Sequence, residues 1–251
     1  MVHVIFLTII SVILVSSVSL IGVISLSLHR KFLDRILLLL VSLSAGTLLG
    51  GAFLHLIPEA AENGFTLQIS SLIILGVISF FILEKFIHWH RCRDTHLHDE
   101  HHPLQHIGIL NLAGDGVHNL IDGLVIAGSY LVSLPVGIAT TFAVIIHEIP
   151  QELADFGVLV YSGFSKKNAI LLNLLSAAIA ILGAIIGLSF VSHRQTFIYF
   201  ILPFAAGGFI YIAGSNLIPE IHKESHLRES IWHVLAMLAG IVLMYGVRFI
   251  D

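Results

Sequence analysis

Long apolar runs separated by short polar stretches make up most of this chain. A helix needs about 20 apolar residues to cross the roughly 30 Å hydrocarbon core of a bilayer. Eight windows meet this requirement: residues 4–28, 36–58, 66–88, 107–131, 135–162, 168–191, 197–219 and 230–250. The runs are continuously apolar rather than alternating, which excludes the strands of a membrane β-barrel. The pattern therefore predicts an all-α membrane protein with eight transmembrane helices in one domain, residues 1–251.

The composition agrees with this pattern. Hydrophobic residues make up 57% of the chain, charged residues 11%, and the mean hydropathy is +0.97, whereas a soluble domain carries about 25% charged residues. These values exclude a soluble enzyme, a disordered tail and a nucleic-acid module. The net charge of −4 offers no basic field to a polyanion, so we expect a lipid bilayer around the chain and no nucleic acid. The first window carries no Lys or Arg and is too long for a signal peptide, so we expect it to remain as a span.

The basic residues predict the orientation in the membrane. Of the twelve Lys and Arg residues, ten lie after the odd-numbered windows: Arg30, Lys31, Arg35, Lys85, Arg91, Arg93, Lys166, Lys167, Lys223 and Arg228. Only Arg194 and Arg248 lie on the other side. Because cytoplasmic loops carry the excess of positive charge, the N- and C-termini are both predicted to lie outside.

A histidine-rich segment separates the third and fourth windows. Residues 88–106 hold seven of the sixteen histidines, interleaved with Asp94, Asp99 and Glu100. This composition suits weak, mobile binding of a metal such as zinc, although an ordinary solvated linker has the same polarity. We expect residues 89–106 to form a cytoplasmic loop that tunes metal delivery and is not part of the permeation site.

An internal repeat relates the second and seventh windows. Residues 45–59 align with residues 206–220 through a shared Ala-Gly, a central alanine (Ala52 and Ala213) and a final Leu-Ile-Pro-Glu. The copies are five windows apart in order, an odd number, so they cross the membrane in opposite directions. Inverted repeats are typical of secondary transporters, whose substrate site lies near the midplane. The repeat predicts a 3+2+3 bundle with windows four and five at its centre.

These two central windows hold most of the ionisable groups expected within the membrane. In window four, Asp115, His118 and Asp122 fall on one helical stripe, with Asn119 beside it. Window five carries two neighbouring stripes, one formed by His147, Gln151 and Asp155 and the other by Glu148 and Glu152. Each acidic group at a membrane helix centre costs about 2.5–3.5 kcal/mol. Neither window contains Lys or Arg, so protons or bound cations must neutralise the carboxylates.

The ligand types narrow the cation. Imidazole and carboxylate without thiolate suit Zn²⁺ and also admit Fe²⁺, Mn²⁺ and Co²⁺. Pro150 removes one backbone hydrogen bond and frees the carbonyl at position 146, which is expected to loosen the helix where a metal enters and leaves.

Three segments together resemble the ZIP (Zrt-, Irt-like protein) metal transporters. His118-Asn119-x-x-Asp122-Gly123 matches the family's fourth-span signature. His147-Glu148-x-Pro150-Gln151-Glu152 is similar to the fifth-span signature His-Glu-x-Pro-His-Glu, with Gln151 at the position of the second histidine. Residues 50–58 resemble the subfamily's second span, whose histidine is a pore ligand.

The resemblance implies a secondary transporter, not an enzyme, that imports Zn²⁺ as its substrate through the cell membrane into the cytoplasm. Fe²⁺, Mn²⁺ and Cd²⁺ are alternative substrates. It also implies a homodimer and a binuclear metal site between spans four and five. The expected metal ligands are His118, Asn119, Asp122, His147, Glu148, Gln151, Glu152 and, in span two, His55. His55 and its repeat partner Asn216 are expected to line the pathway. Glu59 and Glu220, just beyond the Leu-Ile-Pro turns, would either collect cations or act as polar helix caps.

Three other functions remain as alternatives. A cation-diffusion exporter also uses His and Asp on two spans, but it would be expected to have six spans and a cytoplasmic C-terminal domain. An intramembrane metalloprotease needs a His-Glu-x-x-His helix, and here Gln151 replaces the second histidine. A metal sensor that does not transport is the third. Metal flux into sealed vesicles and peptide cleavage separate these functions.

Overall fold

The computed structural model describes residues 2–25, 30–95, 105–223, 226–247 and 249. All regular secondary structure within these residues is helical. The elements are α1 (Val2–Ser17), the 3₁₀ turn η1 (Val18–Leu20), α2 (Ile21–Ser25), α3 (Arg30–Gly50), η2 (Gly51–Leu56), α4 (Ile57–Ala60), α5 (Leu67–Thr95), α6 (Gln105–Val132), α7 (Leu134–Tyr161), α8 (Lys166–Ala177), α9 (Ile179–Ser189), the 3₁₀ turn η3 (Phe190–His193), α10 (Arg194–Tyr211), η4 (Ile212–Leu217), α11 (Ile218–Ile221) and α12 (Leu227–Val247).

Five helical segments are long and apolar enough to cross a membrane: Val2–Val23, Ile36–Ala60, Leu67–Phe86, Lys166–Ile221 and Leu227–Val247. The longest contains the turn η3, with α8 and α9 before it and α10, η4 and α11 after it. The central helices α6 and α7, which carry the buried histidines and carboxylates, are not among the five. The expected all-α membrane class is thus confirmed, whereas the number of eight spans stays a prediction.

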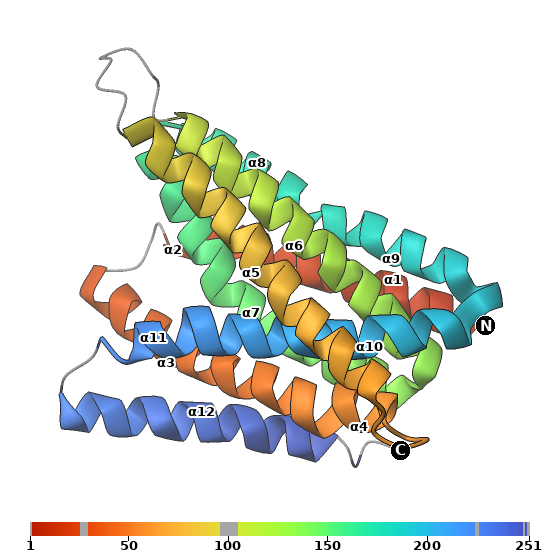
Figure 1. Ribbon diagram of the computed structural model, residues 1–251. Coiled ribbons are helices and arrows are strands. Elements are labelled where there is room, and N and C mark those ends of the chain that lie inside the picture. The colour runs from red at the N-terminus through yellow and green to blue at the C-terminus, as the bar shows by residue number, and fades with distance from the viewer. Residues whose placement is uncertain (1, 26–29, 96–104, 224–225, 248, 250–251) are drawn as a thin grey trace.

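The helices lie side by side in an elongated bundle (Figure 1). The start of α1 and the end of α12 lie at one end of this bundle, and the end of α5 and the start of α6 lie at the other. The expected histidine-rich loop is shorter than its sequence suggested, because α5 continues to Thr95 and α6 begins at Gln105. No Gly or Pro interrupts residues 88–95, so nothing there ends the helix. The remainder of that loop, residues 96–104, lies outside the described part of the chain.

Short capped turns join the central helices to their neighbours. The Ser133 hydroxyl accepts the Val136 N–H at the start of α7, and the Ser165 hydroxyl accepts the Asn168 N–H at the start of α8. Gly163, in the turn between α7 and α8, has φ +88°, a conformation that favours glycine. These local signals set the ends of α7, the helix that supplies half of the site described below.

Three helix pairs cross so closely that only glycine fits at the crossing. A Cβ atom added at any of these glycines would lie 1.9–2.4 Å from a carbonyl oxygen of the partner helix. The glycines are Gly123 and Gly183 for α6 with α9, Gly46 and Gly240 for α3 with α12, and Gly76 and Gly207 for α5 with α10. The site helix α6 is therefore held against α9 by direct backbone contact.

The internal repeat has a counterpart in the backbone. η2 and η4 are both π-helical, they align without a gap in the repeat, and each is followed by a short Ile-Pro-Glu helix. Because π-helices account for well under 1% of residues in proteins, two at aligned positions point to a repeated local structure. Gly46 and Gly207, also aligned, make the same close backbone crossing with their partner helices.

Pro150 does free a carbonyl in α7, but that carbonyl is occupied. The Ser44 hydroxyl of α3 lies 2.7 Å from the Ile146 carbonyl oxygen, to which it donates a hydrogen bond. This bond replaces the one that proline removes and ties α7 to α3. The Ser44 hydroxyl also lies 2.7 Å from the Leu40 carbonyl oxygen, so its single proton is shared between two acceptors. The expected loosening of the helix at Pro150 stays a prediction.

Candidate metal centre

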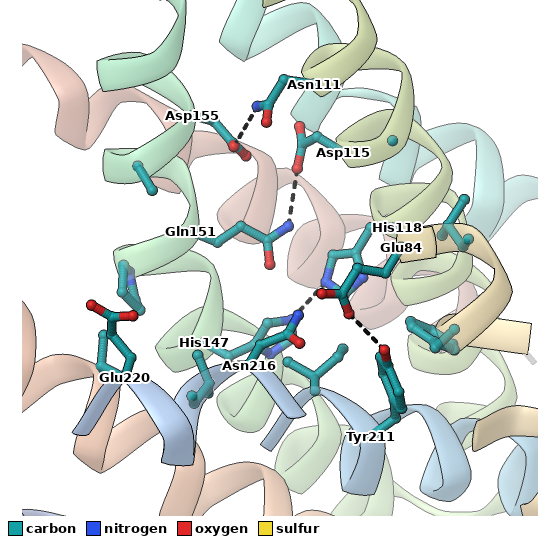
Figure 2. A pocket seen from close by; sticks show the side chains of 18 of the residues that line it. Glu84, Asn111, Asp115, His118, His147, Gln151, Asp155, Tyr211, Asn216 and Glu220 are labelled. Atoms are coloured by element: carbon teal, nitrogen blue, oxygen red, sulfur yellow. Dashed lines mark hydrogen bonds between the residues drawn. The ribbon is translucent and has the colours of Figure 1, made fainter. Parts of the chain in front are cut away.

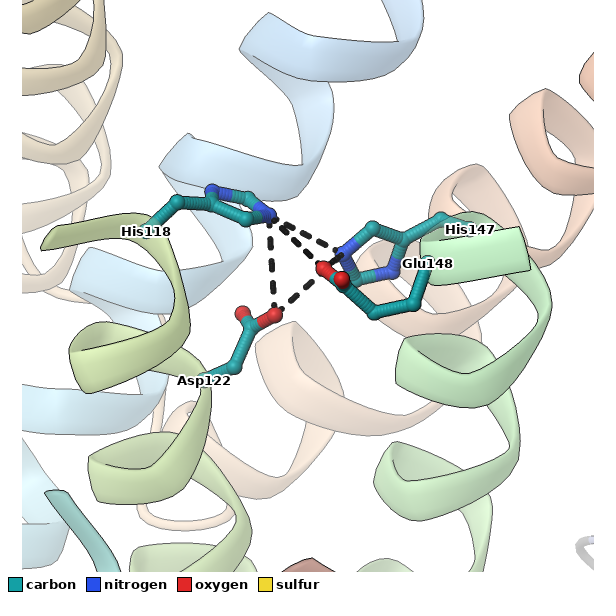
Figure 3. Close-up of side chains that lie close together, drawn as sticks. All are labelled: His118, Asp122, His147 and Glu148. Carbon is teal, nitrogen blue, oxygen red and sulfur yellow. Dashed lines mark hydrogen bonds and ion pairs between the residues drawn. The ribbon is translucent and has the colours of Figure 1, made fainter. Parts of the chain in front are cut away.

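Two histidines and two carboxylates converge at the centre of the α6–α7 contact. His118 and Asp122 come from α6, and His147 and Glu148 come from α7 (Figure 3). One ligand atom from each lies within 4.8 Å of the other three. All four residues are buried, so the bundle presents them to one another and not to lipid.

The four side chains meet through a few atoms. The two Nε2 atoms of His118 and His147 lie 3.1 Å apart. Each Nε2 atom also approaches both carboxylates: His118 is 3.5 Å from Asp122 Oδ2 and 3.3 Å from Glu148 Oε1. The corresponding distances from His147 are 3.3 and 3.2 Å. We call this set of four residues the histidine cluster.

A backbone carbonyl and two phenylalanine rings fix the orientation of the imidazole rings. His147 Nδ1 lies 3.0 Å from the Ala143 carbonyl oxygen. A carbonyl can only accept, so Nδ1 donates this hydrogen bond, and the ring is held with Nε2 facing the cluster. The edge-to-face rings Phe209 and Phe80 pack against His147 and His118 respectively, each at a centroid distance of 5.9 Å. The Nε2 atoms of His118 and His147 are thus held facing each other.

A second group of carboxylates adjoins the histidine cluster. Ligand atoms of Asp115, Glu148 and Glu152 lie within 4.8 Å of one another, so the two groups share Glu148. The Asn173 side chain of α8 donates to one Glu152 oxygen, and the other, Oε1, is buried without a hydrogen-bond partner. We call this set the carboxylate group.

The two amides expected as ligands point their N–H groups at one acceptor. Asn119 Nδ2 and Gln151 Nε2 each lie 3.1 Å from Asp115 Oδ1. The Asn119 side-chain oxygen is buried and has no hydrogen-bond partner, so it remains available to a cation. Both amides therefore orient Asp115, a member of the carboxylate group, and their role as ligands stays a prediction.

The remaining expected ligand, His55, lies elsewhere in the bundle. It belongs to the π-helical segment η2, is buried, and its Nε2 atom lies 2.7 Å from the Met244 carbonyl oxygen of α12. Its repeat partner Asn216 lines the cavity described next, whereas His55 does not. The structure does not bring His55 together with the other expected ligands.

A cavity of 530 Å³ reaches the histidine cluster (Figure 2). Its polar lining includes His118 and His147 together with four carboxylates, and no Lys or Arg is among the described residues that line it. The carboxylates are Glu84, Asp115, Asp155 and Glu220. Sequence analysis did not single out Glu84, its hydrogen-bond partner Tyr211, Asn111 or Asn173. Asn173 could have been found as a polar residue within an apolar window.

The family model described as ZIP zinc transporter matches this chain over residues 2–106 and 88–248. The chain belongs to this family. The ZIP family is one of transporters and not of enzymes, so the metalloprotease alternative is removed. The two ZIP signatures recognised in the sequence are the segments that supply the histidine cluster.

Curated ZIP relatives are similar over most of the chain. The Drosophila melanogaster zinc transporter ZIP13 homolog is 31% identical over 84% of this chain and 77% of its own length. Zinc transporter ZIP13 of Pongo abelii is 36% identical, covering 82% and 65% respectively. Zinc transporter zipt-7.2 of Caenorhabditis elegans is 32% identical, covering 84% and 58%. The match thus spans only about three fifths of the worm relative.

Proposed function

We propose that this chain transports Zn²⁺ across a membrane into the cytoplasm through the histidine cluster. The observation that carries the proposal is the convergence of four ligand atoms from His118, Asp122, His147 and Glu148 within 4.8 Å. Two imidazoles and two carboxylates form a donor set typical of tetrahedral zinc. The names of the curated ZIP relatives support zinc as the substrate.

A bound cation would also solve an electrostatic problem. The buried carboxylates have no Lys or Arg beside them in the cavity lining, and several of their oxygens have no hydrogen-bond partner. An uncompensated buried charge is costly in a low-dielectric interior. A divalent ion neutralises two carboxylates at once, which is why we assign the substrate to this site.

The shared carboxylate supports two ion positions. Glu148 belongs to both the histidine cluster and the carboxylate group, and its Oε2 atom has no hydrogen-bond partner. One ion in the histidine cluster and a second among Asp115, Glu148 and Glu152 would be bridged by Glu148. The second position contains oxygen ligands only, so it should hold zinc less tightly than the first.

The proposed membrane arrangement has eight spans in a 3+2+3 bundle. The polar helices α6 and α7 would then cross at its centre, and the basic ends of α3, α5, α8 and α12 would face the cytoplasm. We also propose that the protein forms a homodimer in the cell membrane, because the resemblance to the ZIP family implies both.

Zinc flux into vesicles tests the proposed activity. Purified protein in sealed liposomes should take up radiolabelled Zn²⁺, and added Cd²⁺, Mn²⁺ or Fe²⁺ should compete if they share the site. Protein-free liposomes and protein with both cluster histidines replaced are the controls. Absence of flux above protein-free liposomes would contradict transport and leave a sensor that binds metal without carrying it.

Thiol labelling in cells tests the orientation. With the native Cys92 replaced by Ser, a cysteine at Lys166 should react only with reagents that enter the cytoplasm, because Lys166 begins α8 at the basic end of the bundle. A cysteine at Arg194, at the other end of the α8–α9 segment, should react from outside. The opposite labelling pattern would show that the chain has the reverse orientation in the membrane and would contradict the proposed direction of import.

We expect the histidine-rich loop to be dispensable for transport itself. Replacing the seven histidines of residues 88–106 by serine should change apparent zinc affinity or regulation, yet leave more uptake than the loss of either cluster histidine. The reason is that the cluster is complete without them: all four of its ligands come from α6 and α7. Initial uptake rates across a zinc titration measure the effect, and a carrier without activity would place the loop in the permeation site.

A further inference from the structure

The far end of the cavity contains a carboxylate that neither metal group uses. Asp155 of α7 lies beside Asp115 of α6, with Asn111 next to them (Figure 2). Asp155 follows His147 by eight residues, which corresponds to about 12 Å along a helix. Asp155 is therefore separate from the histidine cluster, while Asp115 connects it to the carboxylate group.

Amide groups hold one oxygen of each aspartate and leave the other unpaired. Asn111 Nδ2 donates to Asp155 Oδ1, and Asn119 and Gln151 donate to Asp115 Oδ1. Both Oδ2 atoms are buried without a hydrogen-bond partner. The residues themselves are only 6% (Asp115) and 9% (Asp155) exposed. Buried carboxylate oxygens are nearly always satisfied, so two such atoms at one place require an explanation.

The surroundings favour a cation as that explanation. No Lys or Arg lines the described part of the cavity, so no side chain there compensates the charge of the pair. The side chains that donate hydrogen bonds to the pair, Asn111, Asn119 and Gln151, are amides, so the pair itself offers carboxylate oxygens and no imidazole is hydrogen-bonded to it. Such a donor set suits harder divalent cations such as Mn²⁺ more than a zinc site does.

We propose that Asp115 and Asp155 form a further, oxygen-only cation site between the carboxylate group and the end of the bundle at which α6 begins. A divalent ion would be held by the two Oδ2 atoms, with Asn111 and Gln151 as positioning residues. Its role as a station for an ion that leaves the histidine cluster rests on the proposed transport function. Binding of the ion itself does not depend on transport.

Manganese binding to the full-length protein in nanodiscs tests this site directly, because free Mn²⁺ is measured by its electron paramagnetic resonance signal. The His118→Ala/His147→Ala variant removes the histidine cluster and should still bind Mn²⁺. The remaining Mn²⁺ binding should then have two components, one at Asp115, Glu148 and Glu152 and one at the aspartate pair. Adding Asp155→Asn should weaken the second component at least about tenfold, since even loss of an outer partner of a metal ligand costs about 10- to 100-fold.

The matched control is Glu84→Gln in the same background. Glu84 is another carboxylate of the cavity wall, hydrogen-bonded to Tyr211 and outside the aspartate pair. Its removal should change Mn²⁺ affinity less than about twofold, because it alters only the general negative charge of the cavity at a distance. Equal weakening by both variants, or unchanged binding in Asp155→Asn, would overturn the proposal.

A spectroscopic measurement keeps the test valid if the double histidine variant does not fold. In otherwise native protein, pulsed paramagnetic resonance distinguishes Mn²⁺ coupled to imidazole nitrogen from Mn²⁺ bound only by oxygen. Asp155→Asn should reduce the oxygen-only population to the share held by Asp115, Glu148 and Glu152 and retain the nitrogen-coupled one; an undiminished oxygen-only population would refute the site. Failure of zinc transport with this pattern intact would contradict the proposed function and not the site.

Discussion

Replacing His118 by alanine is expected to lower Zn²⁺ uptake below about a tenth of the native rate without unfolding the protein. His118 Nε2 lies 3.1–3.5 Å from ligand atoms of the other three cluster residues, so its loss leaves only three donors. Glu152→Ala should have a comparable effect on uptake, because it removes one of three carboxylates around the proposed second ion. Initial uptake into proteoliposomes, normalised to protein inserted, measures both.

The control is the exposed His193 in the turn η3. Replacing His193 by alanine removes an imidazole outside both metal groups and should leave uptake unchanged. Near-native uptake in His118→Ala, with normal insertion, would remove the histidine cluster from the transport path. Parallel loss of uptake and of the size-exclusion peak would instead show that the variant had unfolded, and His118→Gln then provides a milder test of the same ligand.

Gly123→Ala is expected to destabilise the bundle by about 2–3 kcal/mol or more. The new Cβ would lie 1.9 Å from the Ala180 carbonyl oxygen, and backbone cannot rotate out of the way as a side chain can. α6 and α9 would have to separate, which also moves His118 and Asp122. The midpoint of unfolding in mixed micelles containing increasing sodium dodecyl sulfate measures this effect.

Gly157→Ala is the matched control for that prediction. Gly157 lies in α7, and a Cβ there meets nothing within 4 Å. In a helix this substitution is neutral or stabilising, since alanine loses less backbone entropy than glycine. If the two variants unfolded at the same detergent fraction, the close approach of α6 to α9 would not be a feature of the folded protein.

The helices and the core of the site follow from local sequence patterns. A spacing of three or four residues puts His118 and Asp122 on one face of α6 whatever the rest of the chain does. Adjacent residues on a helix point about 100° apart, so the meeting of His147 and Glu148 with the α6 side chains depends on helix packing as well as on spacing. The turns were also marked locally, by Ser133 and by Gly163.

Contacts between distant segments could not be inferred in the same way. Asn173 reaches Glu152 from α8, and Ser44 reaches the Ile146 carbonyl from α3. Each depends on which helices pack together, a property that no local period encodes. The same limit applies to His55. Its sequence motif predicts a position along the transport pathway, but its Nε2 atom is hydrogen-bonded to the Met244 carbonyl oxygen of α12.

The π-helical segments interrupt the α-helical spacing from which the direction of a side chain is usually inferred. A π turn contains more residues than an α turn, so side chains beyond it are rotated by roughly 100° relative to an uninterrupted α-helix. A helical wheel continued from α10 through Ile212–Leu217 would therefore assign the wrong azimuth to α11. Glu220 lines the cavity in this shifted phase. Because a π turn accommodates about one extra residue, deleting one residue from Ile212–Leu217 should restore α-helical hydrogen bonding there and keep Glu220 at the cavity wall, with the helix shortened by at most about 1.5 Å.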